Sequence, residues 1–260
     1  MEGNSNKQTD NAKKQLKLDE LNFQIHDTLK DFVEKLRAAL GDNLQSVTVV
    51  GSSLTDDFKS GTSDINTVLV LDKQNTSSLN AIASLARPMS KKKLSAPLLM
   101  TASYIERSRD VFGIEFLDLQ LTHRTILGED PFESLTLDKK DVRLQCEREL
   151  KAILIRLRQG YIAAAAKKNL VRDILISTAK SLAPILRAML WLKDIKRSPL
   201  TEPTFKKAAE VFSVNTDVLT TTGKWRHEKT RPDEQQIENT FETIYSIVDR
   251  LADIVDKLEI

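Results

Sequence analysis

The sequence predicts an α+β protein in which a small mixed sheet, flanked by helices, is followed by an all-helical bundle. Two short apolar runs rich in β-branched residues, 47–50 and 68–71, predict buried strands in the first half of the chain. From about Lys139 onward the apolar residues recur only at helical spacing. We therefore expect three segments: a flexible tail at 1–16, a mixed domain at 17–138 and a helical domain at 139–260.

The composition excludes several functional classes. The 39 Lys and Arg residues nearly balance the 37 Asp and Glu residues, so no basic excess indicates duplex DNA as a partner. A single cysteine, Cys146, excludes an intramolecular disulfide or a multi-cysteine metal site, and three scattered histidines disfavour a zinc enzyme. No apolar run approaches the roughly 20 residues that span a bilayer, and no secretory signal is recognisable. We expect a cytoplasmic protein that does not contact a membrane.

The spacing of apolar residues, together with Gly, Pro and capping residues at the ends, predicts the helices and strands of the first half. Apolar residues recur every three or four positions from Leu18 to Leu40, which predicts a helix that ends at Gly41. The two strands come next. After them the pattern predicts a helix over 77–87, an exposed loop from Lys91 to Lys93, a short strand at Ala96–Met100 and a short helix capped by Thr101.

The run 111–121, V-F-G-I-E-F-L-D-L-Q-L, predicts a third strong strand. Its two acids, Glu115 and Asp118, are separated by an odd number of residues, so a strand places them on opposite faces. Further on, apolar stripes predict two long helices at 142–161 and 170–192, the second kinked near Pro184, then a short helix at 205–212 and a terminal helix at 237–255.

The most informative stretch joins the first two strands. Gly51 and Ser52 break the first strand, and about ten residues later the segment 61–64, G-T-S-D, leads into the second. Asp64 and Asn66 are two positions apart, so a strand directs both side chains to one face. Small residues and free backbone N–H groups at a sheet edge suit a phosphate site.

This constellation resembles the nucleotidyltransferase fold of the DNA polymerase β-like superfamily, and its layout is similar to kanamycin nucleotidyltransferase and the minimal nucleotidyltransferases. The resemblance covers roughly 30–130. It implies that Gly51 and Ser52 bind the nucleotide phosphates and that Ser63 supports the turn. It also implies a metal site for Mg²⁺ (or Mn²⁺), in which Asp64 matches the first of two paired carboxylates. Asn66 stands where the family pattern has the second.

The resemblance further implies a third carboxylate from an adjacent strand. Glu115 or Asp118 could supply it, and the apolar residues after Glu115 favour that residue narrowly. The leading hypothesis is an enzyme, a nucleotidyltransferase that moves an NMP from Mg·ATP or another Mg·NTP onto an unidentified hydroxyl acceptor. Because Asn66 removes one formal charge from the metal site, it predicts weakened catalysis.

The sequence is also compatible with two alternative functions. One is a catalytically inactive nucleotide-binding sensor or scaffold, which Asn66 favours directly. The other is an antitoxin-like protein that binds a toxin-like partner, and a homodimer is expected only by analogy. In the helical half, Glu147 or Glu149 could deprotonate the acceptor, but ion pairs with Arg143 or Lys151 are the simpler expectation.

Overall fold

A computed structural model of the chain describes residues 15–56, 58–59, 61, 63–165, 167–225 and 232–260. The expected tail therefore lies almost wholly outside the described residues. The chain divides into two compact units: the first comprises Met1–Arg109 and Leu119–Thr136, and the second comprises Asp110–Asp118 and Leu137–Ile260. The second unit thus takes a nine-residue segment from the middle of the first.

The first unit is built on a four-stranded mixed sheet with the order β3-β2-β1-β4. Strand β1 pairs antiparallel with both β2 and β4, and β2 pairs parallel with β3. The parallel pair is joined through helix α3, as a parallel connection requires a crossover. The bounds are β1 Leu44–Val50, β2 Asn66–Leu71, β3 Leu98–Met100, β4 His123–Leu127 and α3 Thr76–Ser90.

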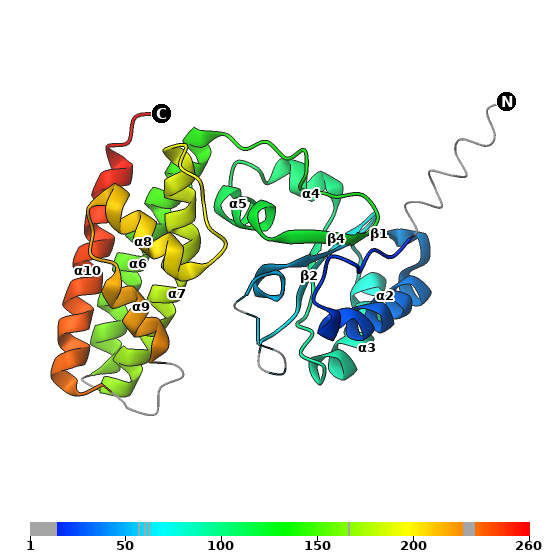
Figure 1. Cartoon of the computed structure of the whole chain (residues 1–260), viewed down its shortest axis with the longest axis horizontal. Helices are drawn as coiled ribbons and strands as arrows, with labels where there is room; N and C mark the ends of the chain where they lie inside the picture. The colour runs from blue at the N-terminus through cyan, green and yellow to red at the C-terminus, as the bar shows by residue number, and fades with distance from the viewer. Residues whose placement is uncertain (1–14, 57, 60, 62, 166, 226–231) are drawn as a thin grey trace. The chain divides into compact units, whose positions relative to one another are not determined.

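Helices α2 (His26–Leu40) and α3 cover one face of this sheet (Figure 1). The apolar stripe of α2, which includes Leu29, Phe32 and Leu36, is buried against the inward-facing residues of the strands. The expected helix before the first strand is confirmed, although it begins at His26 after the short 3₁₀ turn Phe23–Ile25. Thr101 caps helix α4 (Ala102–Arg107) by accepting a hydrogen bond from the Tyr104 N–H, as expected.

The expectation of a strand at 111–121 is wrong. Gly113–Leu121 forms helix α5, in which Ile114 and Leu117 are buried three residues apart. An apolar run of nine residues is too short for its periodicity to distinguish a buried helix from a buried strand. In the structure this run is a helix that buries one face. The strand in this part of the chain is instead β4, which follows α5 and ends at Leu127, just before Gly128.

The second unit is the helical bundle that the sequence predicts. Three long helices, α6 (Lys139–Ala164), α7 (Lys168–Leu192) and α10 (Glu234–Asp256), run along one another, with the shorter α8 (Thr201–Phe212) and α9 (Asp217–Lys224) packed beside them (Figure 1). Helix α9 is not anticipated by the sequence. Helix α7 is long and apolar enough to cross a membrane by length and composition, but it is the buried core helix of this bundle.

Candidate functional site

The Gly-Ser turn lies where β1 ends. Gly51 adopts φ +78°, a left-handed conformation that favours glycine, and it opens the 3₁₀ turn Gly51–Leu54. The Gly51 N–H donates to the carbonyl of Thr122, the residue before β4, at 3.0 Å, so the turn is held beside the start of that strand. The next N–H groups, at Ser52 and Ser53, begin a helical turn and have no intrahelical partner. Ser52 is exposed and Ser53 is buried.

Asp64 and Asn66 stand directly beside this turn. Asn66 is the first residue of β2 and pairs with Val50 across the ladder. A Cβ placed on Gly51 would lie 3.8 Å from the Asn66 amide nitrogen, so the two residues are neighbours. Asp64 is exposed, and its carboxylate has no hydrogen-bond or ion-pair partner among the described residues. The turn and both side chains therefore form one small polar site.

Ser63 closes the loop that precedes Asp64. Its hydroxyl accepts from the Lys59 N–H at 3.0 Å, and its own N–H donates to the Lys59 carbonyl at 2.8 Å. These two hydrogen bonds fix the backbone just before the polar site.

Strand β4 brings a histidine to the same edge. His123 pairs with Val50 on the side opposite Asn66, so the two polar side chains share a sheet face. His123 Nε2 lies 2.9 Å from Asp130 Oδ2, and Nδ1 lies 3.2 Å from the Gln120 carbonyl. Both ring nitrogens are thus engaged by the protein, and β4 itself contains no carboxylate.

The strand on the other side of β2 also lacks an acid. Ile65 forms a bridge to Leu94, and Val68 pairs with Leu98, so the segment 94–100 (L-S-A-P-L-L-M) borders the site. Leu98 shares the face of Val68 and Asn66, and its side chain is 51% exposed. The lysine run Lys91–Lys93 also reaches this part of the sheet. The carbonyl of its last residue, Lys93, accepts a hydrogen bond from the Ile65 N–H at 2.7 Å.

Glu115 and Asp118 lie on α5, in the second unit, whereas Asp64 and Asn66 lie in the first. On a helix they are neighbours at i and i+3, which corrects the expectation of opposite faces. Glu115 accepts a hydrogen bond from Gln145 Nε2 at 2.7 Å. Asp118 is bound through both oxygens by Arg187 at 2.7 and 2.9 Å. Both acids are engaged by bundle helices.

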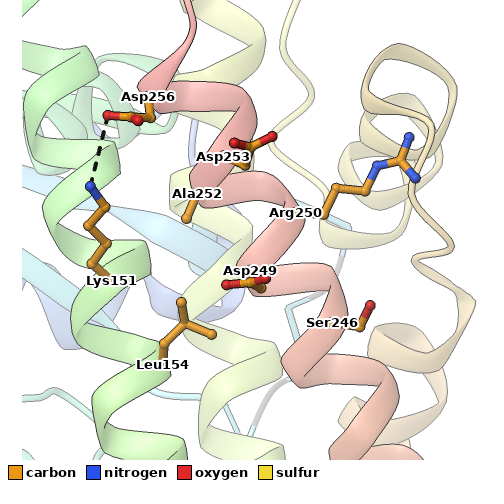
Figure 2. Close-up of a pocket in the computed structure, with 8 residues that line it drawn as sticks. All are labelled: Lys151, Leu154, Ser246, Asp249, Arg250, Ala252, Asp253 and Asp256. Carbon is orange, nitrogen blue, oxygen red and sulfur yellow. Dashed lines mark ion pairs between the residues drawn. The ribbon is translucent and has the colours of Figure 1, made fainter.

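In the helical unit, Glu147 forms ion pairs with Lys151 and Arg143, one helical turn to either side. The hydrogen bond from Lys151 is the largest cause that holds the Glu147 pKa below its ordinary value. Lys151 also faces Asp256 across a shallow depression between α6 and α10 (Figure 2). The expectation of ion pairs around Glu147 is confirmed.

The described strand residues at the Gly-Ser turn do not by themselves supply the ligands for a pair of catalytic metal ions. Two Mg²⁺ ions need several anionic oxygen ligands, but the bordering strands supply one carboxylate, Asp64, and one neutral amide, Asn66. Within the described residues, no group of three or more His, Cys, Asp or Glu side chains is arranged to hold a metal ion.

Comparison with known proteins supports the fold. The chain is similar to the spectinomycin adenyltransferase AAD(9) from Enterococcus faecialis, solved with ATP and spectinomycin. The TM-score is 0.56 at 14% sequence identity, and the match covers 87% of this chain and 98% of that one. No protein-family model and no curated protein matches the sequence. The chain therefore shares the overall fold of that adenyltransferase, a mixed sheet flanked by helices and followed by a helical region.

Two residues at this site were not singled out as site residues from the sequence. Leu98 and His123 reach it through strand pairing over long sequence separations. The only local signal was the β-branched alternation of β4 before Gly128, which follows the apolar run of α5 too closely to stand out.

Proposed function

We propose that this chain binds a nucleoside triphosphate at the Gly51–Ser52 turn without transferring a nucleotidyl group. The observation that carries the proposal is the pairing of the sheet around Asp64. On one side of β2 the partner strand presents Leu98, and on β2 itself Asn66 replaces a carboxylate. One carboxylate cannot clamp both the attacking and the leaving oxygen through two metal ions.

The features that suit a phosphate chain are nevertheless present. The N–H groups of Ser52 and Ser53 supply fixed partial positive charge at a turn whose left-handed first residue favours glycine. The Lys91–Lys93 run is joined to Ile65, the residue between Asp64 and Asn66, by its last carbonyl. Lys92 forms an ion pair with Asp31. Positive charge from Lys91 and Lys93 can take over part of the neutralisation that metal ions otherwise provide.

The test is nucleotide binding by calorimetry on the full chain, with and without Mg²⁺. We expect saturable binding of ATP or another NTP in EDTA, and Asp64→Asn to leave the affinity unchanged or to raise it, since it removes a negative charge beside the triphosphate. If Asp64 instead holds an essential Mg²⁺, Asp64→Asn abolishes binding and EDTA has the same effect.

A charge placed at the turn locates the site. Ser52→Asp puts a carboxylate against the phosphates and should weaken binding by about tenfold or more, the effect of roughly 1.4 kcal/mol of repulsion. The matched control is Ser77→Asp, which adds the same charge at an exposed position in the first turn of α3. Equal affinities for the two variants would exclude the turn as the phosphate site.

A second candidate is a nucleotidyltransferase with residual activity on a hydroxyl acceptor. It is favoured by the Asp64 carboxylate, which has no partner in the described part of the chain, and by the extent of the fold match to an adenyltransferase. Transfer of label from α-³²P-NTPs onto lysate components that is lost in Asp64→Asn would establish this activity and overturn the binding-only proposal.

A further inference from the structure

A groove of about 1150 Å³ lies at the end of the sheet remote from the Gly-Ser turn. It is lined by the start of β1 (44–46), the end of β2 (70–72), the first residues of α4 with its cap (101–103) and the loop after β4 (127–131), together with Arg37, Gly41 and Asp42. We call it the strand-end groove. It belongs wholly to the first unit, and neither Gly51, Ser52, Asp64 nor Asn66 lines it.

Its floor contains a hydroxyl that the protein leaves without a partner. Ser46 is 3% exposed, and its Oγ makes no hydrogen bond within the described part of the chain. Ser46 pairs with Val70 across the ladder, so both side chains lie on one face, and both line the groove. A buried hydroxyl without a partner is unfavourable, and a ligand group in the groove would relieve it.

The loop beside Ser46 approaches it closely. Gly128 has φ +79°, and a Cβ at this position would stand 2.9 Å from Ser46 Cβ and 2.1 Å from the Gln45 carbonyl oxygen. A glycine is therefore required where the loop leaves β4. This contact holds the loop 127–131 against the start of β1, and it makes one wall of the groove a fixed part of the fold.

The charges on the lining are mostly negative. The lining includes four carboxylates, Asp42, Asp72, Glu129 and Asp130, and one guanidinium, Arg37. Asp130 is already engaged by His123, whereas the exposed carboxylates of Asp42 and Asp72 have no ion pair within the described residues. The groove therefore favours a cation.

The spacing of these charges distinguishes an organic cation from a metal ion. No group of three or more acidic or histidine side chains in the described residues is close enough to hold a metal. Carboxylates that are spread along a groove suit a ligand that carries several separated charges, and the apolar residues Leu44, Val70 and Leu127 suit methylene segments between them.

We propose that the strand-end groove binds a small linear polyamine. Its ammonium groups pair with the carboxylates of Asp42 and Asp72, and one of its N–H groups donates to Ser46 Oγ. This site is separate from the nucleotide site proposed above and does not depend on it.

The experiment is titration of the full chain with spermidine by calorimetry, at low ionic strength and without nucleotide. We expect saturable binding that weakens as salt is raised, and no binding of octane-1,8-diol, which has a similar length and no charge. Ser46→Ala and Asp72→Asn should each lower the affinity about threefold to fivefold, as expected for one hydrogen bond and one exposed ion pair.

Two variants serve as matched controls. Thr67→Val removes another buried hydroxyl without a partner, but Thr67 pairs with Val49 on the opposite sheet face and does not line the groove. Asp64→Asn removes a carboxylate at the nucleotide site. Both should bind spermidine as the unsubstituted chain does. Spermidine binding that does not saturate, or that Ser46→Ala and Asp72→Asn leave unchanged in folded protein, overturns the proposal.

Discussion

Arg187 holds both carboxylate oxygens of Asp118, through Nε at 2.7 Å and Nη2 at 2.9 Å. The guanidinium side chain is 12% exposed and the carboxylate 29%. Next to this pair, Arg197 donates from Nη1 to the Leu117 carbonyl at 2.9 Å. Burial is the main cause that lowers the Arg197 pKa, and Asp118 opposes that shift. Asp118 therefore compensates two partly buried cations and joins α5 to α7.

Removal of Arg187 should destabilise the chain strongly. Arg187→Met leaves Asp118 largely buried without its partner, and we expect a loss of about 3 kcal/mol in the free energy of unfolding. The control Arg172→Met removes an arginine whose partner, Asp173, is 60% exposed, and should change stability by less than about 1 kcal/mol. Urea unfolding of both variants measures the difference. Similar losses would show that the buried pair has no special role.

Gln145 joins helix α6 to the start of α5 through two hydrogen bonds. Its Oε1 accepts from the buried Ile114 N–H at 2.9 Å, and its Nε2 donates to Glu115 at 2.7 Å. Gln145→Ala leaves that N–H without an acceptor, so we expect a loss of about 2 kcal/mol in urea unfolding. Glu115→Gln keeps an oxygen acceptor for Nε2 and should cost less than about 0.5 kcal/mol.

The same variant tests the role of Glu115 as a metal ligand. In Mn²⁺ titrations, Glu115→Gln should behave as the unsubstituted chain does, because Gln145 already engages this carboxylate. Lost Mn²⁺ binding would instead restore Glu115 as the third acid.

The helical half was predictable because its stripes are long. Over the 26 residues of α6 or the 23 of α10, a 3.6-residue period is unmistakable. The nine residues of α5 are too few and too uniformly apolar, so the acids in it were assigned to a strand. Because of this error, the third carboxylate was expected on a strand, whereas Glu115 and Asp118 lie on helix α5.

The turn itself was predictable because its signals are local. The left-handed backbone at position 51 favours the glycine found there, and Asp64 precedes a β-branched strand by two residues. The residues that border the turn are set by strand pairing over long distances in the sequence, such as Ile65 with Leu94 or Val50 with His123. No local sequence pattern predicts these pairings. The lack of an acid on the strand segments next to Asn66 and the turn therefore became visible only in the structure of the sheet.

Cys146 should make stability fall at high pH. Burial, with a smaller effect from Glu115, raises the pKa of this thiol from 9.0 to about 12. The unfolded chain therefore loses the thiol proton above about pH 9 while the folded chain keeps it up to about pH 12, so stability falls with rising pH between those values. From pH 8 to pH 10 the contribution is about 1.4 kcal/mol.

A variant isolates this contribution from the other groups that titrate in the same range. In Cys146→Ala the fall between pH 8 and pH 10 should be smaller by that amount, as measured by urea unfolding at both values. Equal pH dependence in the two proteins would show that the folded chain also ionises the thiol.

The final prediction rebuilds the missing carboxylates. Asn66→Asp restores the second acid of the pair, and we expect it to raise Mn²⁺ affinity about tenfold, as added ligand charge does at oxygen sites. Leu98 shares the face of Asn66 on the neighbouring strand and is 51% exposed, so Leu98→Glu adds a third carboxylate without opening the core. The double variant should therefore bind Mn²⁺ more tightly than Asn66→Asp alone.

The control for length is Leu98→Gln, which carries no charge. Combined with Asn66→Asp, it should bind Mn²⁺ as the single variant does, in titrations followed by electron paramagnetic resonance. Equal affinities for the Glu and Gln versions would show that Leu98 does not face the metal position. If Asn66→Asp alone leaves Mn²⁺ affinity unchanged, Asp64 and residue 66 do not share a metal site. The proposed absence of nucleotidyl transfer would then lose its support from Asn66.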